Sequence, residues 1–190
     1  MAIAALAICC LPPQLAAQQD SGRARNAHAG FSFVPPAGWE ASTEYPDPKV
    51  RLLYLGPTHR GFRANVNMMV EKDSGESFED ISQQAKEAYT LMLSAKVAEE
   101  GRITIDGKDT LYMSSAYRMG PLSIKNAQFF IRGGNGKVYI LTFTTTADAF
   151  ASLGPAIAQS ARSIKIEKKQ LPSLPKSPRA TRAGQPISGK

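Results

Sequence analysis

The chain has 190 residues, of which 43% are apolar and 21% are charged, so it suits one globular domain with extensions and is not a disordered or fibrous protein. Its formal net charge is +7, but from Lys165 to the end there are seven basic residues and one acidic residue. The basicity therefore belongs to the C-terminal tail, and the near-neutral remainder has no general attraction for acidic partners.

The first 17 residues, MAIAALAICCLPPQLAA, are an apolar run followed by small residues. The run is too short to span a bilayer as a helix, which takes about 20 apolar residues. The pattern predicts a secretory signal peptide over residues 1–17, cut after Ala17. No Lys or Arg precedes the run, which a start codon assigned too late would explain. The alternative is a buried N-terminal helix of a cytoplasmic protein.

Both cysteines, Cys9 and Cys10, lie inside this leader, so cleavage leaves a mature protein without disulfide or thiolate chemistry. The stretch Leu6-Ala7-Ile8-Cys9 matches a lipoprotein acceptor only in part, because Ile stands where a small residue usually precedes the cysteine. We therefore expect an exported protein, periplasmic or secreted, rather than a lipid-anchored one.

Residues 18–29, QQDSGRARNAHA, are small and polar and predict a flexible lead-in to a domain over residues 30–167. Alternation and β-branched or aromatic content predict strands at 31–34, 50–55, 62–71, 102–105, 109–118, 122–132 and 137–145. Turn signals at Asp106-Gly107, Met119-Gly120-Pro121 and 133–136 join the last four strands into an antiparallel meander.

Two helices are expected, at about 78–98 and 147–162. The first has Ser77 as N-cap and one apolar face formed by Phe78, Ile81, Ala85, Ala88, Tyr89 and Met92. In the second, Gly154-Pro155 is expected to break the pattern, with the helix restarting at Pro155. Residues 168–190 are basic and proline-rich without periodicity, which predicts a disordered tail.

The stretch FSFVPPAGWE, residues 31–40, contains the only tryptophan of the chain. A strand leads into Pro35-Pro36, which excludes helix, and Gly38 permits the reversal of the chain. We interpret Trp39 as a cover for the end of the sheet core, and a ligand-stacking platform is the alternative.

The order of these elements resembles the PsbP-like family in the broad sense, including the DcrB-like bacterial envelope proteins. Three segments carry the resemblance: Phe31–Pro35 with Gly38-Trp39, Lys137–Thr144, and Phe150–Ile166. The resemblance implies an α+β fold, an α/β/α sandwich in which a long helix and a C-terminal helix pack on an antiparallel sheet of six to seven strands. These segments are hydrophobic and structural, so they do not separate the PsbP-like from the DcrB-like branch.

No arrangement of residues predicts catalysis, a metal site or a cofactor. His28 lies in the lead-in, and His59 lies in GPTHRGF without a third ligand at a metal spacing. The glycines at 133–136 lack the strand-to-helix context and the Lys-Ser/Thr ending of a phosphate loop.

The segment 57–63 is the most interesting candidate site, read as an exposed loop between strands. It combines His59, Arg60, Phe62 and Arg63, which could bind an anionic group of a protein partner. The basic tail could add weak contact with anionic lipid or cell-wall polymer. Nucleic acid is not expected, because the tail has no aromatic residues for base stacking and the protein is exported.

The sequence thus favours a non-enzymatic exported binding or assembly module of the bacterial cell envelope, which recognises a protein partner through its sheet and loops. The alternatives are a small-ligand carrier or enzyme with a cleft between sheet and helix, and a photosynthetic accessory protein.

Overall fold

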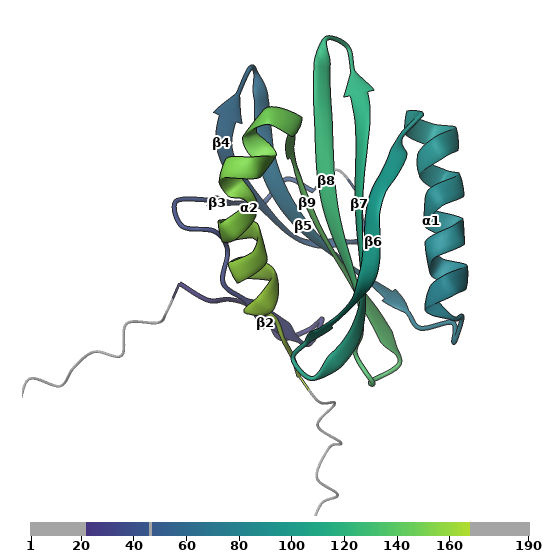
Figure 1. The fold of residues 1–190 in the computed structure, drawn as a ribbon. Helices are drawn as coiled ribbons and strands as arrows, with labels where there is room; N and C mark the ends of the chain where they lie inside the picture. Colours follow the sequence, from purple (N-terminus) through teal and green to yellow (C-terminus); the bar gives the residue numbers. More distant parts are fainter. Residues whose placement is uncertain (1–21, 46, 168–190) are drawn as a thin grey trace, which may run out of the picture.

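The computed structural model describes residues 22–45 and 47–167. The expected signal peptide, the two cysteines and the basic tail lie outside the described residues. Figure 1 shows an antiparallel sheet with helix α1 (Phe78–Leu93) against one side and α2 (Ala147–Arg162) against the other. The predicted α+β sandwich is therefore confirmed.

The large sheet has seven strands, all paired antiparallel. In spatial order they are β3 (Glu40–Ser42), β4 (Val50–His59), β5 (Phe62–Lys72), β9 (Lys137–Thr146), β8 (Leu122–Arg132), β7 (Lys108–Met119) and β6 (Lys96–Ile105). The strands β6 to β9 form the predicted meander, and β9 lies between β8 and β5 in the middle of the sheet.

A second, three-stranded sheet closes one end of the domain. It consists of β1 (Ala24–Asn26), β2 (Phe31–Phe33) and β10 (Lys165–Ile166), with β2 in the centre. The lead-in expected to be flexible thus contains a strand, and Ala29 within it is buried. The sequence Ala-Arg-Asn has no β-branched or aromatic residue to indicate a strand, so its pairing with β2 is what makes it one.

The main core lies between the large sheet, β2 and α2. Its fully buried side chains include Phe31, Phe33, Val66, Met68, Ile131, Tyr139, Leu141, Phe143 and Ile164. Alternate residues of β5 and β9 supply it, as a half-buried strand requires. The hydroxyl of Tyr139 donates a 3.0 Å hydrogen bond to the carbonyl of Ala29, which ties β9 to the N-terminal segment.

Helix α2 runs without interruption through Pro155, so the predicted break is wrong. Proline removes one hydrogen bond, the one that would end at the carbonyl of Ala151. Both residues are exposed, so that carbonyl stays accessible to solvent. The opposite side of the helix buries Ile157 and Ala161 against the sheet, and this packing maintains the helix.

Helix α1 ends at Leu93 rather than near residue 98. Ser94 adopts a left-handed conformation (φ 49°) as C-cap, and from Lys96 the chain pairs with β7 as the ten-residue strand β6. Cross-strand pairing overrides the helical propensity of this segment. A glycine just beyond a helix commonly ends it, but Gly101 lies inside β6.

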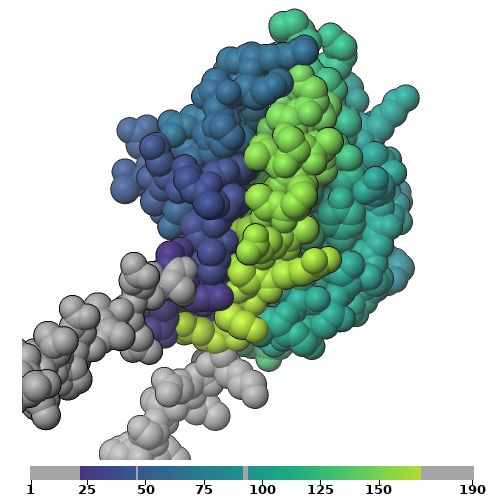
Figure 2. Space-filling model, turned by 60° about the vertical axis from the view of Figure 1, so that its left-hand side comes forward, coloured from purple at the N-terminus to yellow at the C-terminus, as the bar shows by residue number. Residues whose placement is uncertain are grey.

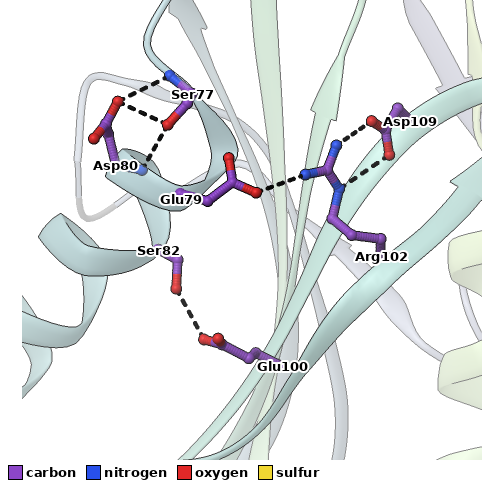
Figure 3. A network of polar contacts seen from close by, with 7 residues as sticks. All are labelled: Ser77, Glu79, Asp80, Ser82, Glu100, Arg102 and Asp109. Atoms are coloured by element: carbon purple, nitrogen blue, oxygen red, sulfur yellow. Dashed lines mark hydrogen bonds and ion pairs between the residues drawn. The ribbon is translucent and has the colours of Figure 1, made fainter.

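Polar contacts attach the N-terminal half of α1 to β6 and β7 (Figure 3). Ser77 and Asp80 form a capping box, in which the amide of Asp80 donates to the Ser77 hydroxyl at 3.0 Å. Arg102 of β6 forms ion pairs with Glu79 of α1 and with Asp109 of β7. The guanidinium of Arg102 also lies 4.2 Å from the centre of the Phe78 ring, which is buried.

Farther along α1, the hydroxyl of Ser82 donates to Glu100 of β6 at 2.8 Å, and Lys86 pairs with the same carboxylate at 2.7 Å. The hydrogen bonds from Lys86 and Ser82 lower the pKa of Glu100.

No described helix is long and apolar enough to span a bilayer.

Candidate functional site

The segment 57–63 is the tip of the β4–β5 hairpin and not a loop, which corrects the prediction. Arg60 and Gly61 are the two turn residues, both with positive φ (49° and 82°), and His59 pairs directly with Phe62. Pro57 lies where the pairing register shifts between Leu55 and Thr58, an irregularity that accommodates a residue without an amide hydrogen.

Two of the candidate residues meet Asp148 at the start of α2. The Nε of Arg60 lies 2.9 Å from one carboxylate oxygen of Asp148, and the Nδ1 of His59 lies 3.4 Å from the other. The pKa of Asp148 is lowered, mainly by a hydrogen bond from Thr146. Partial desolvation raises this pKa, but the positive charges of Arg60 and His59 add to the effect of Thr146, and the net shift is downward. The hairpin tip is thereby attached to the helix.

Arg63 has a different partner. Its guanidinium lies 2.6 Å from the carboxylate of Glu40 on β3 and donates to the carbonyl of Gly56 at 3.3 Å. Phe62 is half-buried. The four candidate residues are therefore neighbours on one hairpin but do not converge on one anion site, because each arginine already has a carboxylate partner. The result is an exposed surface of mixed charge.

The contacts of His59 do not form a catalytic relay. Thr146 Oγ1 lies 3.0 Å from His59 Nδ1, and Asp148 approaches this same nitrogen. In a catalytic triad the acid and the nucleophile contact opposite nitrogens, so that the ring can pass a proton between them. Within residues 22–45 and 47–167, no three His, Cys, Asp or Glu side chains lie close enough to hold a metal ion.

We expect Asp148→Asn to loosen the hairpin tip and to speed amide hydrogen exchange at residues 58–62. Since the native pKa of Asp148 is lowered, its contribution is present above the unfolded value and is lost as pH falls through the native pKa. The difference between variant and parent should therefore be seen at pH 7 and vanish in strong acid. Glu167→Gln, which removes the exposed ion pair with Arg25 at the other end of the domain, is the control. Equal exchange at the tip in both variants would contradict the assigned contact.

Trp39 packs on the core, as interpreted from the sequence. Its ring lies edge-to-face with Phe143 at a centroid distance of 6.4 Å and covers Gly56 of β4. Beside it a groove of about 600 Å³ runs between the β2–β3 turn, Tyr54 and α2. The sequence did not indicate this groove, because Tyr54 and Gln159 reach it only through the fold.

No family model and no curated protein matches this chain. Several solved structures share its fold. A PsbP of Synechocystis sp. PCC 6803 aligns with a TM-score of 0.57 at 14% identity, over 76% of this chain and 91% of that one. LpqN of Mycobacterium tuberculosis, described as involved in cell envelope biogenesis, aligns with a TM-score of 0.58 at 14% identity, over 73% of this chain and 83% of that one.

A protein of unknown function from Pseudomonas aeruginosa, PA94, aligns with a TM-score of 0.55 at 16% identity, over 70% of this chain and 99% of that one. At such identities the likeness concerns the arrangement of strands and helices, and it covers nearly the whole described domain. The chain therefore has the PsbP-like fold.

Proposed function

We propose that this chain is a non-enzymatic, exported binding or assembly module of the bacterial cell envelope. It recognises a protein partner through the exposed tip of the β4–β5 hairpin, with His59, Arg60, Phe62 and Arg63 as the contact residues. The observation that carries the proposal is that this tip is exposed and at the same time held in place by two other elements.

The contacts of the tip favour recognition over a solvated turn. Asp148 holds Arg60 and Glu40 holds Arg63, yet the two arginine side chains remain 70% and 46% exposed. A side chain held near its bound position loses less conformational entropy on association. A mixed-charge patch also selects its partner by matching or opposing charges, which gives specificity more than raw affinity.

Export and an envelope role are supported by two further observations. The leader over residues 1–17 has the character of a secretory signal. LpqN, which shares the fold, is described as involved in cell envelope biogenesis. The basic tail is proposed to add weak, salt-sensitive attraction to anionic lipid or cell-wall polymer.

Site-specific photocrosslinking tests the partner surface. A photoreactive residue replaces Thr58 at the hairpin or, as the matched control, Thr104 on the edge strand β6; both are exposed strand threonines. We expect a discrete protein adduct in envelope fractions from position 58 and none from position 104. Arg60→Glu combined with Arg63→Glu should reduce the adduct several-fold, because the charge pattern that the partner matches is reversed.

Two outcomes would count against the proposal. Adducts of equal yield from positions 58 and 104 would mean nonspecific contact. Adducts from position 104 alone would move recognition to the β6 edge of the sheet.

A further inference from the structure

A cleft of about 250 Å³ lies between α2 and the strands β6, β7 and β8, on the side of α2 away from the Trp39 groove. Its walls are almost entirely apolar and include Ile105, Tyr112, Ala127, Phe129, Phe150 and Ile157. Figure 2 shows α2 from outside, in green, running between the N-terminal segments in blue and the teal strands that border this cleft.

The space exists because small residues line the helix. Gly154, Ala158 and Ala161 are the positions of α2 that border the cleft together with its larger side chains. A Cβ atom added at Gly154 would meet no atom within 4 Å. A glycine in a helix interior weakens the helix relative to alanine, and no neighbouring atom among the described residues requires a glycine at position 154.

The two ends of the cleft differ in charge. Arg162 borders one end and makes no ion pair within the described part of the chain, while the nearby carboxylate of Asp106 is occupied by Lys165 at 3.0 Å. At the other end the ammonium of Lys125 lies 4.4 Å from the centre of the Phe150 ring. The carboxylate of Glu99 is also on that side, 3.4 Å from the hydroxyl of Tyr112. The Arg162 end therefore carries a net positive charge, because Lys165 neutralises Asp106 and leaves Arg162 unpaired among the described residues, whereas Lys125 and Glu99 balance each other at the other end.

We propose that this cleft binds the alkyl chain of a singly charged anionic amphiphile, with the carboxylate or similar head group against Arg162. An arginine at the mouth of an apolar cleft complements this class of ligand, because a guanidinium can bind a carboxylate with two parallel hydrogen bonds. Each methylene is about as large as a water molecule, which occupies about 30 Å³, so the cleft accommodates about eight carbons.

Chemical-shift titration of the full-length protein tests the site with three probes of equal chain length: octanoate, 1-octanol and octylammonium. We expect saturable shifts at the amides of Phe129, Gly154 and Ala158, with octanoate binding tightest and octylammonium weakest. Hexanoate lacks two of these methylenes and should bind about 15-fold more weakly than octanoate, since each buried methylene changes the dissociation constant about fourfold. Affinity should level off above eight to ten carbons, when the cleft is full.

Substitutions locate the ligand within the cleft. Gly154→Leu should fill the space and weaken octanoate at least tenfold. If this variant does not fold, Gly154→Ala, whose added methyl meets no neighbour, should still weaken octanoate about fourfold by removing the space of one methylene. Arg162→Gln should weaken octanoate three- to tenfold and leave 1-octanol unchanged, and Lys125→Gln is the matched control that should change neither.

Three results would overturn the proposal. One is the absence of saturable octanoate shifts up to millimolar concentration. Another is octanoate binding that Gly154→Leu and Gly154→Ala leave intact, which would place the ligand elsewhere. The third is equal weakening by Arg162→Gln and Lys125→Gln, or equal affinity for octanoate and 1-octanol, which would remove the role of Arg162 as the head-group contact.

Discussion

Phe143→Ala is expected to lower the free energy of unfolding by about 3–5 kcal/mol, a large share of the 5–15 kcal/mol that a domain of this kind usually has. Phe143 is fully buried on β9, the central strand of the sheet. Its ring lies edge-to-face with Trp39 and with Phe129, at centroid distances of 6.4 and 6.2 Å. Alanine would leave a cavity that neighbours from different elements cannot fill. Urea denaturation followed by circular dichroism measures the change.

Leu91→Ala is the control for this prediction. Leu91 lies on α1 and is 84% exposed, so its truncation should change the free energy of unfolding by no more than about 0.5 kcal/mol. If Phe143→Ala costs no more than Leu91→Ala does, the core is not centred on β9, and the packing described for α2 and the Trp39 turn is wrong.

The strands that the sequence predicts well are bounded by local turn signals. The sequence predicts β8 at 122–132, where it is observed, because turns with glycine bound this strongly β-forming run on both sides. It predicts β9 at 137–145, one residue short, because a glycine-rich turn marks only its start and its end runs directly into α2. The Asp106-Gly107 turn likewise has positive φ at both residues (52° and 69°), as a two-residue hairpin requires.

The errors occur where a distant segment decides the local structure. Residues 96–98 are part of a strand because this strand pairs with β7, and β1 is a strand because it pairs with β2. Pro155 remains helical because the buried face of α2 continues past it. None of these determinants is local, so propensity and periodicity could not reveal them.

The candidate site was predictable only in part. The sequence selected His59 and Arg60 from their composition and their position between strands. It could not reveal Asp148 as their partner, because 88 residues separate Asp148 from Arg60 and only the fold brings them together. The sequence offered a cleft between sheet and helix only as an alternative and could not place it beside Gly154, because its walls come from β6, β7, β8 and α2.

Gly56→Ala is expected to lower the free energy of unfolding by about 2–3 kcal/mol, although the change adds a single methyl group. The conformation of Gly56 is not the cause, because its φ is not positive. The added Cβ would lie 2.4 Å from Cε2 and 2.8 Å from Cδ2 of Trp39. The indole must therefore move off the sheet and expose Phe143. Since Trp39 is the only tryptophan, its fluorescence emission should shift to longer wavelength in the folded variant.

A double-mutant cycle separates this steric cause from any general intolerance of β4. In a Trp39→Ala background the clash is gone, so Gly56→Ala should cost less than about 0.5 kcal/mol there and can even stabilise by restricting the unfolded chain. Gly101→Ala is the matched control, since that strand glycine has open space at its Cβ. Additive costs of Trp39→Ala and Gly56→Ala would mean that the indole does not rest on Gly56. The indole of Trp39 would then not be held against β4 at Gly56, and its ring would be free to stack on a ligand in the neighbouring groove.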